Sequence, residues 1–144
     1  MVIMNSELDL EKEFNGRALK FIEEAVATEK IYVLVQDKMC VQTESLEFTR
    51  EDDEPLDTIP LWTESYVENA KTWAEDYATL EEMPVSYLIE EFLPEIEEGY
   101  CSVGLNWDQD GIGRELPPFH LVQLLVKQVK EGKITEKDLD ISEE

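Results

Sequence analysis

The segment from Asn106 to Gly111 has the one spacing in this sequence that is typical of a binding site. Oxygen-bearing side chains stand at alternate positions, Asn106, Asp108 and Asp110, and a glycine follows, as in the first half of a calcium-binding loop. The second half differs, because Pro117 stands where such a loop carries its bidentate glutamate. Calcium at these three side chains is one interpretation. We favour the other, a plain turn in which Asp and Gly satisfy the backbone angles.

The parts of a catalytic site are scarce. His120 is the only histidine, so the chain has no cluster of imidazole metal ligands, and its place at a predicted helix start favours a cap or a surface position. Cys40 and Cys101 lie in apolar, strand-like segments where buried free thiols are expected, and nothing in the sequence brings either thiol next to His120. Neither a nucleophile elbow nor a phosphate-binding glycine loop is present. We therefore predict no catalytic residues, no cofactor and no enzymatic activity.

Two tryptophans are candidates for a ligand site. Trp62 and Trp107 both end predicted strands, and the rim of a sheet of this kind is where small ligands tend to bind. The competing interpretation is that both are core aromatics. A small-molecule sensor or regulator with a pocket near Trp62 and Trp107 is therefore the alternative function for this chain.

Charge dominates the composition. The chain has 35 Asp and Glu against 12 Lys and Arg, a formal net charge of -23, which excludes binding to nucleic acid or to an anionic membrane surface. Between Lys71 and Arg114 there is no basic residue at all. A predicted helix in that interval carries a run of carboxylates on its polar side, and we take them as the candidate partner-binding residues: Glu90, Glu91, Glu95, Glu97 and Glu98.

This asymmetry has two interpretations. The acidic stretch is either a solvated surface without a partner or an interface for a basic protein, in the manner of an immunity protein or a nucleic-acid mimic. We predict a non-enzymatic interaction domain as the first hypothesis. Self-repulsion among the carboxylates also predicts that moderate salt raises the melting temperature.

The 144 residues fit a single domain, which we place at 1–133, with an acidic loop at about 50–58 and an acidic C-terminal tail at 134–144. No basic residue or long apolar run stands at the start of the chain, and no apolar run approaches the length of a membrane span of about 18 residues. The expected location is the cytoplasm.

The hydrophobic pattern predicts helices and strands in turn. In the first half, a helix over Ser6–Thr28 turns Ala18 and Phe21 inward and Arg17 and Glu24 to solvent, and a hairpin turn at Asp37-Lys38 follows a strand. The other elements expected in this half are strands over Ile31–Val35, Met39–Thr43, Leu46–Thr49 and Ile59–Trp62 and a helix over Glu64–Glu75 that is capped by the Thr63 hydroxyl and turns Val67, Ala70 and Ala74 inward.

The second half is expected to continue the alternation. Ser86 is the predicted cap of a helix that stops at Gly99, and a last helix runs from Pro117-Pro118 to about Glu131. Thr135 starts a further turn, and the chain is expected to fray from Asp138. The remaining expected strands are Met83–Val85, Tyr100–Trp107 and Ile112–Leu116.

These elements predict an α+β fold. A small mixed sheet would carry an N-terminal hairpin and a central strand-helix-strand-helix-strand segment with parallel neighbours, covered by about four helices. Within this order the chain carries four short motifs: Pro60-Leu61-Trp62-Thr63; a helix with Tyr66, Ala70, Trp73 and Ala74; Ile89-Glu90-Glu91-Phe92-Leu93-Pro94; and Val103-Gly104-Leu105-Asn106-Trp107.

The combination resembles the bacterial domain-of-unknown-function family numbered 2750, from about Gly16 to Val129. The resemblance implies a small cytoplasmic α/β domain and supplies no catalytic residues. The acidic segment Glu51–Glu54 and the tail after Lys133 look like additions to the family pattern.

Overall fold

The computed structural model describes residues 2–49, 55–98 and 101–139 of the chain, and it has the predicted α+β class. The helices are α1 (Val2–Thr28), α2 (Val67–Ala74), α3 (Val85–Tyr87), α4 (Leu93–Glu98), α5 (Pro118–Glu131) and α6 (Glu136–Leu139), with the short helical turns η1 (Glu64–Tyr66) and η2 (Leu88–Phe92). The strands are β1 (Lys30–Gln36), β2 (Met39–Cys40), β3 (Thr43–Thr49), β4 (Pro55–Trp62), β5 (Thr79–Pro84), β6 (Cys101–Leu105) and β7 (Arg114–Leu116).

The strands form one mixed sheet in which β1 and β4 hold the central positions. β1 pairs with β5 along one side and with β2 and β4 along the other, all antiparallel. β4 continues to β6, which is parallel to it, and β7 closes the row antiparallel to β6, while β3 pairs with β4. The prediction of parallel neighbours is therefore right for β4 and β6 and wrong for β5.

The position of β5 follows from the way the chain leaves α2. Glu75 ends that helix with a positive φ of 53° and a ψ of -121°, which redirects the chain. β5 then runs along the open side of β1, where it pairs antiparallel over six residue pairs. It is also longer than the predicted Met83–Val85 strand. Hydrophobic alternation reports which side chains are buried, but it does not report which strand edge is still open.

The N-terminal hairpin is confirmed at its turn. Asp37 and Lys38 have φ values of 52° and 69°, as a two-residue turn that follows the twist of its strands requires. The returning strand is shorter than predicted, because β2 stops at Cys40 and the chain starts again as β3 at Thr43. The acidic loop predicted at about 50–58 is wrong for 55–58, which belong to β4, and 50–54 lie outside the described residues.

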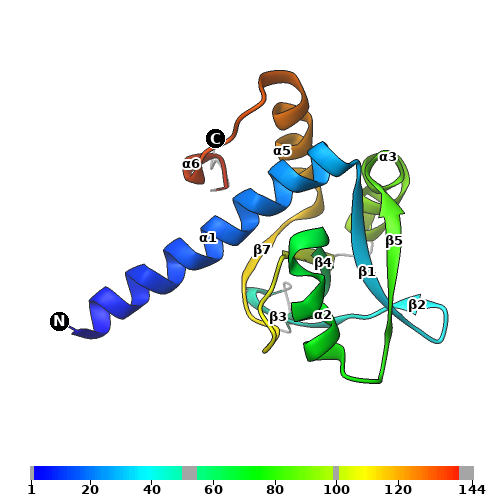
Figure 1. Cartoon of the computed structure of the whole chain (residues 1–144), viewed down its shortest axis with the longest axis horizontal. Coiled ribbons are helices and arrows are strands. Elements are labelled where there is room, and N and C mark those ends of the chain that lie inside the picture. The colour runs from blue at the N-terminus through cyan, green and yellow to red at the C-terminus, as the bar shows by residue number, and fades with distance from the viewer. Residues whose placement is uncertain (1, 50–54, 99–100, 140–144) are drawn as a thin grey trace.

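Each face of the sheet packs into its own core. The larger core joins one face to α1, α3, α4, α5 and α6 through residues such as Phe21, Leu61 and Leu121. The smaller core joins the other face to α2 and contains Trp62 and Trp107. Figure 1 shows α1 running across the molecule and β5 at its margin beside α3. The strands β1, β4 and β6 are buried on both faces, which explains why their sequences read as nearly continuous apolar runs.

The helix after β5 contains a wide turn. Leu93 donates its amide hydrogen to the Leu88 carbonyl, five residues back, instead of four. Pro94 follows at once; it has no amide hydrogen, and its ring would clash with the carbonyl four residues earlier in a regular helix. The wide turn relieves that clash. Pro84 takes the N-cap position, so the predicted cap at Ser86 is wrong.

The C-terminal part is more ordered than predicted. α5 ends at Gly132, as expected, with a φ of 73°. Beyond it, Asp138 accepts a hydrogen bond from the Thr135 amide (2.8 Å) and pairs with Lys127 (2.8 Å). Leu139 is fully buried in the larger core. Fraying from Asp138 is therefore wrong for residues 138 and 139, and residues 140–144 lie outside the described part of the chain.

The tryptophan rings leave no room for a side chain at three glycines, Gly104 in β6, Gly111 in the turn and Gly113 just before β7, and Gly104 is the sharpest case. A Cβ at that position would lie 2.2 Å from Cε2 of Trp107. We expect Gly104→Ala to lower the free energy of unfolding by about 1–3 kcal/mol, measured by urea denaturation. Gly16→Ala is the matched control, because nothing lies within 4 Å of its Cβ and it sits inside α1, so it should stabilise by about 0.5–1 kcal/mol. Equal effects of the two substitutions would contradict the packing described.

Candidate functional site

The two tryptophans predicted at the sheet rim are core residues. Trp62 is 0% exposed and Trp107 is 2% exposed. The Trp62 indole donates to the Trp107 carbonyl (3.1 Å), and the Trp107 indole donates to the Arg114 carbonyl (3.1 Å). The ring of Trp73 packs against both at centroid distances of 6.0 and 6.1 Å. These are the contacts of the core-aromatic interpretation, because both side chains are buried and both indole N–H groups are used inside the protein.

A small open pocket does lie beside this cluster. It has a volume of about 140 Å³ and is lined mainly by apolar side chains of β1, α2 and the segment after α2. Gln36 and the hydroxyl of Tyr77, a residue 73% exposed, supply polar groups at its edge. Pockets that bury a small organic ligand usually measure about 300–1,000 Å³. This pocket is below that range.

The candidate calcium residues do not converge. Asn106 is fully buried, with a left-handed φ of 49°, and its side-chain oxygen accepts the Thr63 amide hydrogen at 2.8 Å. Its side-chain nitrogen donates to the Thr63 hydroxyl (3.0 Å) and to the Arg17 carbonyl (3.3 Å). Asn106 therefore ties together α1, the end of β4 and the end of β6, and it faces the interior.

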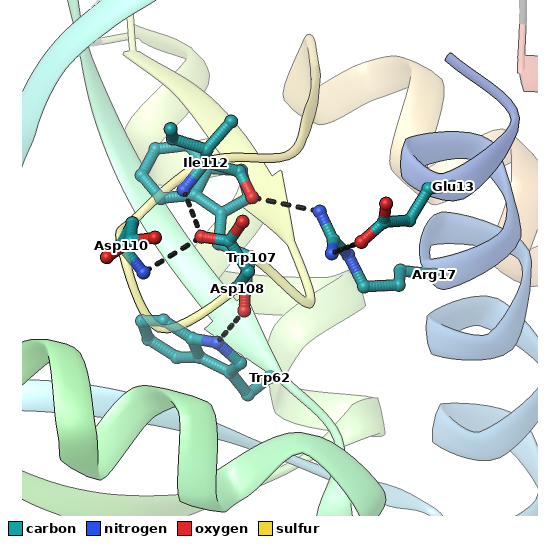
Figure 2. A network of polar contacts seen from close by, with 7 residues as sticks. All are labelled: Glu13, Arg17, Trp62, Trp107, Asp108, Asp110 and Ile112. Carbon is teal, nitrogen blue, oxygen red and sulfur yellow. Dashed lines mark hydrogen bonds and ion pairs between the residues drawn. The ribbon is translucent and has the colours of Figure 1, made fainter. Parts of the chain in front are cut away.

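Asp108 and Asp110 stand in the turn itself. Asp108 accepts the amide hydrogens of Asp110 (2.9 Å) and Ile112 (3.1 Å) with one carboxylate oxygen, as Figure 2 shows. These are the contacts of a turn stabilised by its own aspartate. These contacts are those of the plain-turn interpretation. A calcium ion bound by all three side chains would require Asn106 to give up its hydrogen bond with Thr63.

Arg17 holds this turn from the outside of the sheet. One guanidinium nitrogen donates to the Ile112 carbonyl (3.0 Å) and another pairs with Glu13 (2.8 Å), so the side chain spans from α1 to the turn (Figure 2). The residue is 8% exposed. The sequence placed Arg17 on the solvent-facing side of α1, and that prediction is wrong. Helical periodicity gave no sign of the contact, because the turn lies 95 residues away along the chain.

The cap of the helix after β4 also comes from α1. Thr63 occupies the N-cap position but makes no side-chain cap bond, because its hydroxyl is engaged by Asn106. Glu24 instead accepts the Ser65 amide hydrogen (2.9 Å) and the Ser65 hydroxyl hydrogen. The predicted cap by Thr63 is therefore wrong, and so is the solvent-only position of Glu24. Partial burial acts to raise the pKa of Glu24, but hydrogen bonding to Ser65 and Thr63 and the positive charge of Lys20 together outweigh it and hold that pKa below its ordinary value.

A buried polar cluster joins three strands, and the sequence did not reveal it. Thr58 of β4, Ser102 of β6 and Glu115 of β7 are each at most 1% exposed. The two hydroxyl oxygens are 2.7 Å apart, and each lies 3.2 Å from the same Glu115 oxygen. Since each hydroxyl has one hydrogen, one donates to the other while the second donates to the carboxylate. The cluster fixes the order of the strands on this face of the sheet.

His120 and the two cysteines lie in buried or half-buried positions. The His120 ring nitrogen Nε2 bonds to the Asp138 carbonyl (2.9 Å), and the residue is 6% exposed, so the cap or surface position predicted for it is wrong. Both Cys40 and Cys101 are half-buried thiols. Burial raises the pKa of the Cys40 thiol, and the Glu81 carboxylate raises it further. Burial, followed by Asp57, does the same to the pKa of Cys101. A raised pKa keeps each thiol protonated and weakly nucleophilic.

Three of the five candidate partner-binding carboxylates lie on the surface. Glu90, Glu91 and Glu95 are exposed on the helix that follows β5, and the side chains of Glu97 and Glu98 lie outside the described residues. Sequence reasoning left two exposed carboxylates of β5 out of this group, Glu81 and Glu82, although both fall in the interval without Lys or Arg. β5 leads directly into α3. We call the five exposed residues the acidic surface: Glu81, Glu82, Glu90, Glu91 and Glu95.

Four of the five carboxylates of the acidic surface have no ion-pair partner among the described residues. Lys30 reaches Glu82 at 3.5 Å, and no other described residue forms an ion pair with these five side chains. In the whole described part of the chain, no three His, Cys, Asp or Glu side chains are placed to hold a metal ion. No helix within residues 2–49, 55–98 and 101–139 combines the length and the apolar character that a bilayer crossing requires.

Fold and surface together define an α+β domain with a mixed sheet, helices on both faces and an acidic margin. Comparison with known proteins identifies the family: residues 18–125 match the model of the protein family of unknown function DUF2750, and the chain belongs to that family. Neither the curated proteins nor the solved structures contain a match.

Asn106 carries an amide acceptor that no neighbouring group replaces. We expect Asn106→Ala to lower the free energy of unfolding by about 2 kcal/mol or more in urea, because the buried Thr63 amide loses its partner. Asn106→Gly is the control, since it removes the same side chain but tolerates the left-handed backbone. The alanine variant should be less stable than the glycine variant by about 1 kcal/mol. Two variants of equal stability would show that the left-handed conformation at residue 106 costs nothing.

The lowered pKa of Glu24 makes its contribution depend on pH. A carboxylate whose pKa is lower in the folded chain stabilises the fold above its unfolded pKa and loses that effect as pH falls through the folded pKa. At pH 7 we expect Glu24→Gln to cost about 0.3–1 kcal/mol, and the difference from the natural chain should vanish at acid pH. Glu23→Gln, one residue away and exposed, should show no comparable pH-dependent loss. Thermal melts of both variants between acid and neutral pH measure this.

Proposed function

We propose that this member of the family is a non-enzymatic interaction domain that binds a basic protein surface through its acidic surface. The observation that carries the proposal is the set of five exposed carboxylates on β5 and the following helix, with Lys30 as their one described ion-pair partner. The formal net charge of -23 extends the same sign over the whole molecule.

Electrostatics supports a protein partner of opposite sign. Exposed carboxylates without cations nearby create a negative potential that raises the association rate with a basic surface. The same potential repels nucleic acids and anionic membranes. Complementarity of this kind is how immunity proteins cover nuclease toxins and how nucleic-acid mimics occupy DNA-binding proteins, and we propose the same mode for this chain.

The interior supports a binding role more than a chemical one. The buried polar groups described above are hydrogen-bonded in ways that fix strands and turns, as in the Asn106–Thr63 and Thr58–Ser102–Glu115 contacts. The half-buried thiols have raised pKa values. The alternative, a small-molecule sensor, is left with the pocket beside Trp73, whose volume of about 140 Å³ does not favour it.

The proposal predicts a partner whose binding depends on this surface. A pull-down from the native cell should recover a protein with a basic patch, and the triple variant Glu90→Gln, Glu91→Gln, Glu95→Gln should slow association with it by about tenfold or more at low salt. The matched control neutralises three exposed carboxylates elsewhere, Glu64→Gln, Glu68→Gln and Glu131→Gln, with the same change in net charge. Stopped-flow or biosensor kinetics measure the rates. Recovery of no basic partner, or equal slowing by both triple variants, would sink the proposal.

A further inference from the structure

Among the described strands, none pairs with the side of β5 that faces away from β1, and this edge carries Glu81 and Glu82 of the acidic surface. We infer that it takes an extended, lysine- or arginine-rich segment of the partner protein as an additional strand. The inference rests on the proposed function and adds the mode of binding: backbone hydrogen bonds supply the pairing, and Glu81 and Glu82 supply the preference for a basic segment.

The pairing of β1 shows which backbone groups of β5 face outward. Leu34 accepts the Val41 amide hydrogen, so its backbone groups point to the β2 and β4 side. Residues of a strand alternate in direction, so Ile31, Val33 and Val35 point to β5. Their partners in β5 are Met83, Glu81 and Thr79.

The intervening residues of β5 therefore point away from β1. Leu80 and Glu82 direct both their N–H and C=O groups to the free edge, while Pro84 has a C=O alone there. In the described chain no hydrogen bond reaches the backbone of Leu80 or Glu82 from that side. Figure 1 shows β5 near the margin of the molecule, between α3 at its upper end and the β2 turn at its lower end.

Charge decides what can pair with this edge. Unpaired edges invite aggregation, and charged side chains on the edge are a common protection. Glu81 and Glu82 lie on opposite faces of the sheet, because neighbouring residues of a strand alternate, and both are exposed. A second copy of this chain would place its own carboxylates against them, which disfavours self-pairing. A strand with two consecutive basic residues would instead meet one carboxylate on each face.

The size of the edge limits the segment. β5 has six residues, Thr79–Pro84, so the added strand covers about six residues at most. Lys30 pairs with Glu82, at 3.5 Å and with its side chain 31% exposed, so an incoming lysine exchanges with an existing surface pair instead of meeting an isolated charge.

The test uses two peptides of equal charge. The probe is Thr-Thr-Val-Lys-Lys-Val-Thr-Thr, and the control replaces both valines with proline, which removes the N–H groups that a strand must donate. In two-dimensional NMR of the full chain, the probe should shift the Leu80 and Glu82 amide signals and slow their hydrogen exchange, and the proline peptide should not. Equal effects of the two peptides, or no effect of either on these two amides, would overturn strand addition.

A pair of variants separates backbone pairing from charge. Glu82→Gln and Glu82→Pro remove the same charge, but only proline also removes the outward N–H, and the pairing with β1 is unaffected because that N–H faces away from β1. We expect Glu82→Gln to weaken probe binding several-fold and Glu82→Pro to weaken it about tenfold more, a change worth about 1.4 kcal/mol. Melting curves confirm that both variants are folded. Protection of the Leu80 amide from hydrogen exchange when the probe is added to the natural chain tests the inference without any variant.

The outcomes distinguish the two proposals. If both position-82 variants bind alike, and the three-carboxylate variant Glu90→Gln, Glu91→Gln, Glu95→Gln still loses the native partner, the acidic surface binds a partner but not by strand addition. If the probe pairs with β5 and that variant keeps the native partner, the edge inference holds and the role assigned to the helix carboxylates fails.

Discussion

The structure depends on one buried amide. Asn106 stands where β6 ends, and its side chain joins the Thr63 amide after β4 to the Arg17 carbonyl of α1. A buried amide hydrogen without an acceptor is costly, so the Asn106 side chain holds these three segments in one arrangement. The left-handed backbone of Asn106 then turns the chain so that the Trp107 ring lies flat over Gly104. The position of Asn106 therefore sets where the tryptophan cluster, the turn at Asp108 and the start of the helical segment after Thr63 lie.

The α1 helix is the second constraint, because it supplies polar contacts as well as an apolar face. Arg17 holds the turn at Ile112, and Glu24 caps the helical turn at Ser65. Asn15 accepts a hydrogen bond from Arg114 of β7. The helix α1 therefore holds the turn before β7, β7 itself and the helical turn after β4. Side chains of α1 therefore take part in the polar contacts of the interior as well as in the larger core.

At β5 an unpaired strand edge and negative charge occur together. β5 pairs with one side of β1, so its outward backbone groups face away from the sheet, and its two exposed carboxylates precede those of the following helix in the chain. A sheet edge supplies directional pairing, whereas an acidic helix face supplies long-range attraction. The two together describe a surface suited to an extended basic segment better than either does alone.

The sequence by itself determined the α+β class, the family, the hairpin turn at Asp37-Lys38 and the limits of α5, because periodicity, turn residues and Gly132 act locally. Its motifs also led to the family that residues 18–125 match. Only the tertiary structure decided the antiparallel place of β5, the burial of Trp62 and Trp107, and the inward direction of Asn106. Arg17 and Glu24 look like ordinary surface charges in a helical pattern, and their partners lie 95 and 41 residues away. Contacts at such separations are set by how whole elements pack, and no local pattern of residues records them.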